Sequence, residues 1–141
     1  MNVNLIRYTP EQWYAYSDAA HRAIFKASRE PWLDRISFAL LARDGERVLG
    51  FVTCRETDSE SVYWQYGGCV DQHRGAPAVR AFQALLADAR SRYRRCSTLV
   101  KNDNVNYLHL LMKHGFRAIG MRTFQGEIFL EMHREFEHAI S

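Results

Sequence analysis

Apolar residues follow two spacings along this chain, and the switches between them predict the order of its elements. A short apolar run at residues 2–8 indicates an opening strand. Thr9, Pro10 and Gln12 then form the sequence of a capping box with proline at the first helical position. Apolar residues recur at helical spacing from Trp13 onward, so we expect this helix to run to about residue 27.

Three β-rich runs follow, starting at Ser37, Arg47 and Ser61. The turn segments "RDGE" and "TDSES" separate them, which favours an antiparallel meander. Helical spacing returns over residues 77–93, a short strand is expected at 96–100, and "KNDNVNYLHLLMKHGF" predicts a further helix. Two strands around "FQG" complete the chain.

This order predicts one α/β domain over residues 1–141, which is an ordinary length for a single domain. Strands joined by hairpins and then by a strand, helix, strand crossover give an antiparallel sheet that becomes parallel in its middle. Sheets often receive ligands where the pairing changes in this way.

Composition excludes several classes of protein. No apolar stretch is long enough to cross a bilayer, and the first residues lack the order of a signal peptide, so we expect a soluble, intracellular and cytoplasmic protein. Cys54, Cys69 and Cys96 have no zinc-type spacing and are expected to be reduced thiols in strands. His109 and His114 diverge on one helix, so no metal site is expected.

The net charge is +3, and much of the excess lies in "RSRYRR" at residues 90–95 and "HRG" at 73–75. Arginines at a helix end are favoured by its dipole and are usually solvated. They can also meet a phosphate of a nucleotide cofactor or of nucleic acid. Nucleic-acid binding ranks lowest, because the patch is short.

Two expected helices begin directly after strands, at Pro77 and near Asn104. The first amides of a helix lack internal partners and carry partial positive charge, so either start can hold an anion. The first is the better candidate, because Gly75 and two alanines leave the backbone open and Arg74 adds a charge.

Gly67 and Gly68 lie near the end of the preceding strand, where glycines often mark a bulge. We expect a bulge here that frees the amides of Cys69 and Val70.

The segments "CVDQHRGAPAVRAFQALLADA" and "STLVKNDNVNYLHLLMKHGF" resemble the two central motifs of the GNAT superfamily, the acyl-CoA-dependent N-acyltransferases. The second is the more specific, with Asn104 early in the helix and Lys113, Gly115 and Phe116 at its end. The element order also fits, so the chain resembles a divergent member along most of its length. The resemblance implies a mixed, mostly antiparallel sheet flanked by helices.

It also implies acetyl-CoA as cosubstrate. In the family, pantetheine lies between the fourth and fifth strands, and the diphosphate lies on the loop before the next helix. The backbone of Cys69 and Val70 would then bind pantetheine, the loop would bind the diphosphate, and Asn104 would reach the cofactor. The expected cofactor-binding residues are Cys69, Val70, His73, Arg74, Gly75, Ala76, Ala78 and Asn104.

The sequence departs from the family pattern at several positions. Pro77 and Val79 stand where the loop usually has its later glycines, and Leu111 stands where many members have a proton-donating Tyr. Tyr107, one turn earlier on the same face, is the candidate proton donor; its other interpretation is a packing aromatic. The expected fourth strand has no carboxylate, so Asp71 is the candidate base, with His73 and His109 as alternatives.

Two functions from different classes remain open at this stage. The first is N-acyl transfer, most simply acetyl transfer, to an unidentified amine, with Trp32, Phe124 and Glu127 as candidate walls of the acceptor site. The alternative is a catalytically degenerate member that acts as a structural or interaction protein, such as a phage virion-associated protein. A homodimer is compatible with either function.

Overall fold

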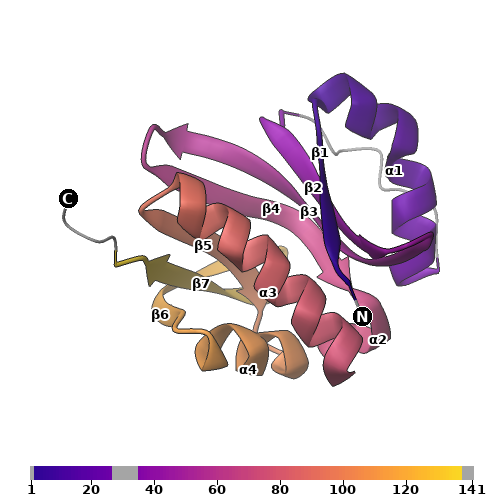
Figure 1. Ribbon diagram of the computed structural model, residues 1–141. Coiled ribbons are helices and arrows are strands. Elements are labelled where there is room, and N and C mark those ends of the chain that lie inside the picture. The colour runs from indigo at the N-terminus through magenta and orange to yellow at the C-terminus, as the bar shows by residue number, and fades with distance from the viewer. Residues whose placement is uncertain (1, 27–34, 138–141) are drawn as a thin grey trace.

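The computed structural model describes residues 2–26 and 35–137, which form a seven-stranded sheet with helices on both faces (Figure 1). In chain order the elements are β1 (Asn4–Tyr8), α1 (Pro10–Phe25), β2 (Phe38–Asp44), β3 (Arg47–Asp58), β4 (Ser61–Cys69), α2 (Val70–His73), α3 (Gly75–Arg92), β5 (Arg95–Lys101), α4 (Val105–Lys113), β6 (Arg117–Phe124) and β7 (Glu127–Glu135).

The first helix begins as the sequence predicts. The Gln12 amide donates to Thr9 Oγ1 at 3.2 Å, and the Thr9 amide donates to Gln12 Oε1 at 3.0 Å, which completes the capping box. The helix ends at Phe25, two residues before the predicted end, because Lys26 takes a left-handed conformation (φ +59°) and its amide bonds back to Arg22.

The strands lie in the order β1-β2-β3-β4-β5-β7-β6. Each neighbouring pair is antiparallel except β4 and β5, which run parallel. The predicted change from antiparallel to parallel pairing in the middle of the sheet is therefore confirmed. Cys54, Cys69 and Cys96 are free thiols buried in β3, β4 and β5, as predicted.

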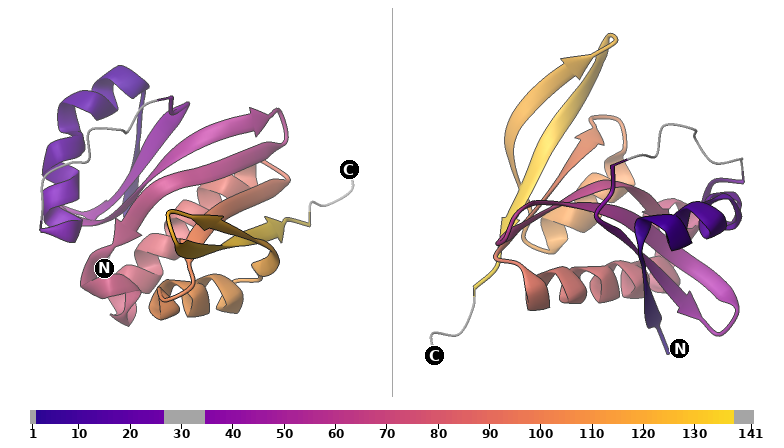
Figure 2. Two further views of the ribbon diagram at one scale, coloured as in Figure 1. Left: turned by 180° about the vertical axis from the view of Figure 1, so that it is seen from behind. Right: turned by 90° about the horizontal axis from the view of Figure 1, so that it is seen from above.

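Two apolar cores cover the two faces of the sheet. On one face, Trp13 and Ala20 of α1 pack against Leu41 and Phe51. On the other, α3 and α4 bury a larger core that includes Phe82, with α3 crossing the sheet and α4 beside β6 and β7 (Figures 1 and 2). Burying a large apolar side chain stabilises a fold by roughly 1.5–3 kcal/mol, so these two layers fix the position of the strands.

The β6–β7 hairpin stands out from the rest of the sheet (Figure 2). β6 is an edge strand, and Ile119, Met121 and Phe124 on it are 59–65% exposed. Among the described residues, no helix is both long and apolar enough to cross a membrane.

The end of α4 explains why the sequence reads Lys-x-Gly-aromatic there. Gly115 has φ +87° and ends the helix, and the Phe116 amide bonds back to Leu111 at 3.1 Å. The guanidinium of Arg134 lies where a Cβ on Gly115 would stand, and it donates to the His114 carbonyl. Phe116 is then directed into the core, where it is 2% exposed.

The β4–α3 segment differs from the prediction in two ways. The register of β3 and β4 shifts at Gln65, while Gly67 and Gly68 pair regularly with Val52 and Phe51, so the predicted bulge at the glycines is wrong. The helix α3 begins at Gly75 instead of Pro77, and the short turn α2 precedes it. Pro77 is therefore the third residue of α3, a position that also lacks an intrahelical donor bond.

Candidate active site

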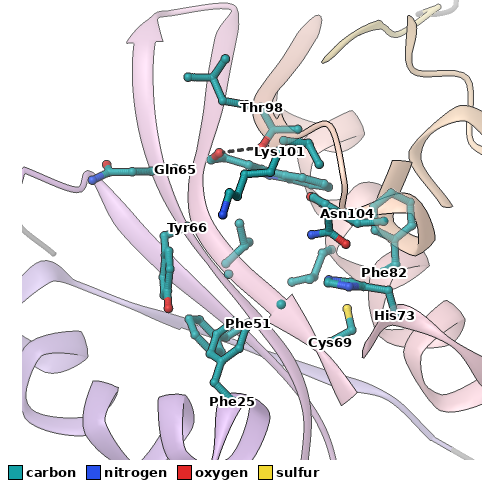
Figure 3. Close-up of a pocket in the computed structure, with 18 of the residues that line it drawn as sticks. Phe25, Phe51, Gln65, Tyr66, Cys69, His73, Phe82, Thr98, Lys101 and Asn104 are labelled. Carbon is teal, nitrogen blue, oxygen red and sulfur yellow. Dashed lines mark hydrogen bonds between the residues drawn. The ribbon is translucent and has the colours of Figure 1, made fainter. Parts of the chain in front are cut away.

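The strands β4 and β5 pair only over their first residues, from Ser61 and Arg95 to Trp64 and Thr98. At the last pair, Thr98 Oγ1 donates to the Trp64 carbonyl at 3.0 Å. No further pair joins the two strands in the described part of the chain, so they separate like a fork. A cavity of about 290 Å³ lies in this fork (Figure 3).

The fork cavity is lined mainly by apolar and aromatic side chains. Phe25 and Phe51 close it on the α1 side, and Phe82 closes it on the α3 side (Figure 3). Polar groups reach it from several elements: Lys101 and Asn104 lie across the cavity from Tyr66 (Figure 3). Gly67, Gly68 and Cys69 of β4 also line it, beyond the last residue of β4 that pairs with β5.

Four of the residues predicted from the sequence lie together in this cavity. Cys69, His73, Asn104 and Tyr107 all line it. Asn104 makes no side-chain capping bond to α4, and its amide points into the cavity (Figure 3). The other predicted residues do not line it: Val70, Asp71, Arg74, Gly75, Ala76 and Ala78.

The loop beyond β4 has an unusual backbone. Asp71, Gln72 and His73 have φ values of +53°, +53° and +66°, and Gly75 has +84°. A left-handed conformation costs a non-glycine residue roughly 1–2 kcal/mol, so this turn is strained. Asn106 of α4 donates to the Gln72 carbonyl at 3.3 Å and holds the turn against the next helix.

The start of α3 offers two backbone donors. The first amides of a helix have no intrahelical partner, and Pro77 has no amide hydrogen, which leaves those of Gly75 and Ala76. Both residues are exposed. Ala78 is fully buried in the core and Val79 packs against it, so neither side chain stands in the way of a ligand at this end of the helix.

Tyr107 lines the fork cavity and is partly buried. Its ring stacks on His73 with centroids 4.6 Å apart and meets Phe82 edge-on, and its hydroxyl forms a hydrogen bond with Thr98. Burial raises the pKa of Tyr107 well above its usual value. The group therefore stays a neutral phenol that can donate a hydrogen bond. Leu111, at the family's Tyr position, is fully buried.

His73 is also held neutral, since burial lowers the pKa of this imidazole to about 4. Asp71, the predicted base, is exposed on the strained turn and outside the cavity.

A pair that the sequence did not predict lies at the opposite wall. His21 Nε2 of α1 lies 2.6 Å from the Tyr66 hydroxyl of β4, and the rings are parallel to within 4° at a centroid distance of 5.7 Å. His21 is 3% exposed, while Tyr66 lines the cavity. A contact across 45 residues depends on how α1 is placed on the sheet, and no local sequence signal marks it.

A second cleft, of about 650 Å³, opens on the face of the sheet that carries α1, between β4 and β5 on one side and the β6–β7 hairpin on the other. Gln65, Thr98 and Leu99 line both cavities, so the two meet where the strands separate. Phe124 and Glu127, predicted as acceptor walls, do not line this cleft, and Trp32 lies outside the described residues. The second cleft is lined by Arg55, Thr57, Tyr63, Gln65, Ser97, Thr98, Leu99, Ile119, Arg122, Glu131, Met132 and His133.

No protein-family model matches the sequence, and no curated protein matches it either. Solved structures do resemble the fold. A GNAT family acetyltransferase from Elizabethkingia anophelis, crystallised with acetyl-CoA bound, aligns with a TM-score of 0.68 and 14% identity over 96% of this chain and 99% of that one.

Two further solved structures resemble the same fold. The ribosomal-protein-S18-alanine N-acetyltransferase of Escherichia coli has a TM-score of 0.72 and 11% identity, covering 98% of this chain and 96% of that one. Arabidopsis thaliana Naa50, in complex with a CoA-peptide bisubstrate analogue, has a TM-score of 0.69 and 16% identity, covering 96% of this chain and 100% of that one. At these identities the likeness concerns the fold, and the protein has the fold of the GNAT acetyltransferases, as the resemblance of its two central motifs predicts.

Proposed function

We propose that this protein is an acyl-CoA-dependent N-acyltransferase that transfers an acetyl group from acetyl-CoA to an amine. The fork between β4 and β5 is the observation that carries the proposal. A strand edge without a partner, next to a mostly apolar cavity, can bind an extended chain of amides and methylenes such as pantetheine. Structural neighbours that hold acetyl-CoA or a CoA-peptide conjugate support this assignment.

The diphosphate would lie at the start of α3. The exposed amides of Gly75 and Ala76 and the positive end of the helix favour an anion there, and the exposed Arg74 adds a charge. A Cβ added to Gly75 would have its nearest neighbour, Pro77 Cδ, at 3.9 Å, so the backbone is open to a ligand. Cys69 and Val70 would bind pantetheine through their backbone, and Asn104 would contact it from α4.

The reaction needs an amine lone pair to attack the thioester carbonyl carbon, so that a C–N bond forms, the C–S bond breaks and CoA leaves as a thiolate. Tyr107, the candidate donor, has a raised pKa and is a poor source of a complete proton. We assign it a hydrogen bond toward the departing sulfur, made when its hydroxyl turns away from Thr98, with the proton then coming from water.

The attacking amine also loses a proton. Asp71 lies outside the cavity, whereas the Tyr66 hydroxyl lies at its wall and is hydrogen-bonded to the buried His21. We assign the Tyr66–His21 pair as the acceptor of this proton, because a phenol backed by an imidazole can pass a proton away from the reacting atoms.

Acetyl-CoA binding is the first test. Acetyl-CoA at about a thousandfold excess over its dissociation constant should stabilise the fold by roughly 4 kcal/mol, seen as a rise in Tm. ADP, which lacks the pantetheine arm, is the control and should shift Tm much less. No shift with acetyl-CoA, or an equal shift with ADP, would contradict the proposal.

The proton acceptor is tested separately. Tyr66→Phe keeps the ring in the wall and removes the hydroxyl, so kcat should fall about a hundredfold in an acetyl-CoA assay with a panel of amines. The rise in Tm with acetyl-CoA should be unchanged. An unaltered kcat would remove Tyr66 from the reaction and leave the binding proposal intact.

The alternative function, a structural or interaction protein that has lost the reaction, is favoured by two observations. Leu111 is apolar and buried where a Tyr is expected, and the edge strand β6 exposes apolar side chains. In that case acetyl-CoA would leave Tm unchanged. Association with a phage particle and formation of a homodimer stay predictions.

A further inference from the structure

The second cleft is the strongest unassigned feature of the molecule, and we infer from it the chemical class of the acceptor. We propose that the acceptor is an amine with an anionic group a few bonds from its nitrogen, and that Arg55 binds the anion. The inference rests on the proposed function, because it places the amine next to a thioester in the fork cavity.

The position of the cleft follows from the sheet. α1 packs on β1–β4, and no described helix covers β5 and β7 on that face. Tyr63 and Gln65 of β4 and Leu99 of β5 therefore face an open space bordered by the hairpin. A molecule in this cleft reaches the fork cavity past Gln65 and Leu99, which line both.

Arg55 is a charged group beside that passage, because it contacts Gln65 directly. Its Nη2 donates to Gln65 Oε1 at 3.3 Å, and its Nε donates to the Arg35 carbonyl at 3.2 Å. These two bonds fix the plane of the guanidinium. Within residues 2–26 and 35–137, Arg55 has no acidic side chain at ion-pair distance.

The other charges of the cleft largely cancel. Arg122 Nε pairs with Glu131 Oε1, so this cation already has its counterion. Among the arginine and glutamate side chains that line the cleft, two arginines and one glutamate leave one uncompensated positive charge, at Arg55. A guanidinium in this state attracts a carboxylate or phosphate and repels an ammonium group.

Tyr63 adds a hydroxyl at the same place. Burial raises the pKa of Tyr63, while Arg122 and Arg55 lower it and Glu131 raises it, so the phenol lies within the field of all three charges. It stays protonated near neutral pH and can donate to the same anion. Because Arg55 contacts Gln65 directly, the anion would lie only one side chain away from the passage. This short span fits an amino acid better than a long polyamine.

Carboxylate and phosphate satisfy a guanidinium equally well, so the experiment uses matched pairs of both. The probes are glycine and alanine against their α-amides, and O-phosphoethanolamine against ethanolamine, each assayed with acetyl-CoA. We expect the anionic member of a pair to have a KM lower by about tenfold or more, since a bond to a charged group is lost in the neutral member. The pair with the larger ratio identifies the anion.

Arg55→Gln provides the test of the residue. It should raise KM for the anionic probe about tenfold, leave KM for the neutral partner unchanged, and leave the rise in Tm with acetyl-CoA unchanged. Arg94→Gln is the matched control, because Arg94 is an exposed arginine outside the cleft and should affect neither probe.

Three results would overturn the inference while the proposed function stands: a preference for the neutral members, a preference that survives Arg55→Gln, or no turnover of any probe by a protein that acetyl-CoA stabilises. If acetyl-CoA does not raise Tm, the proposed function fails and the inference fails with it.

Discussion

Gly67 and Gly75 stand eight residues apart, at the two ends of the segment that leads from β4 into α3, and they are there for different reasons. A Cβ on Gly67 would overlap the Phe51 carbonyl oxygen and lie 2.9 Å from Val52 Cα. A Cβ on Gly75 would meet nothing closer than 3.9 Å, and what Gly75 supplies is a φ of +84°.

The difference separates a glycine that the fold requires, Gly67, from one that leaves room for a ligand, Gly75. At Gly67 the adjacent backbone of β3 occupies the space, so the residue belongs to the packing of the sheet. At Gly75 the space is open to solvent beside two free amides. The same residue type thus marks a structural contact at one end of the segment and a candidate binding surface at the other.

Gly67→Ala should have the largest effect on stability. The added methyl group would meet backbone atoms of β3, which cannot rotate away, so the strands must separate at a cost of about 4 kcal/mol. Urea unfolding followed by circular dichroism measures this loss. Gly120→Ala is the control, because its Cβ would lie 3.4 Å from the Glu131 carboxylate, and it should cost far less. Equal losses would show that β3 and β4 are less closely packed than the structure has them.

His73, between the two glycines, should make stability depend on pH. Burial lowers its pKa to about 4 in the folded protein, against about 6.5 when unfolded. The unfolded chain therefore binds a proton first as pH falls. The stabilisation is complete above pH 6.5 and is lost toward pH 4, by up to about 3 kcal/mol.

His73→Phe keeps a ring against Tyr107 and removes the titration. Unfolding free energies at pH 7.5 and pH 4.5 should differ less for this variant than for the original protein. If the two proteins lose the same stability over this range, His73 is solvated and the segment before Gly75 is more open than described.

Gly75→Ala should cost about 1–2 kcal/mol, because alanine at this φ is strained but meets no neighbour. We also expect it to reduce the rise in Tm with acetyl-CoA, since the methyl group stands beside the free amides. Gly45→Ala is the matched control, with φ +58° and no atom within 4 Å in the β2–β3 turn. It should lose similar stability and keep the full response to acetyl-CoA. If acetyl-CoA raises Tm equally for Gly75→Ala and Gly45→Ala, Gly75 is not part of the binding surface.

Asn104→Ala should change stability least, within about 0.5 kcal/mol, because this side chain makes no capping bond. It should still weaken the response to acetyl-CoA, which a thermal titration measures. A clear loss of stability without ligand would place Asn104 with Gly67, among residues that the fold itself requires.

The sequence predicted the elements well where a local signal determines them. The capping box at Thr9 and the glycine at the end of α4 act within one helical turn, and both are confirmed. The sequence predicts the start of α3 at Pro77, because proline favours the first helical position. The left-handed turn at residues 71–73 moved that start to Gly75. Asp and His tolerate a left-handed backbone but do not require it, so the sequence does not determine such a turn.

The candidate site was predicted in part for the same reason. Cys69, His73 and Asn104 belong to segments with recognisable motifs, and they meet in the fork. The Tyr66–His21 contact and the charge at Arg55 depend on how α1 and the hairpin lie over the sheet. Such contacts between distant segments are set by packing, so the sequence showed neither.

Cys69 carries a last consequence for the chemistry of the fork. Its thiol lines the cavity where a thioester would lie, and a thiolate in that position would capture the acyl group and block the protein by self-acylation. Burial raises the pKa of this thiol to about 12, so almost none of it is ionised at neutral pH. The cavity thus keeps a nucleophile beside an activated acyl group in its unreactive form, and the acyl group is left for the amine.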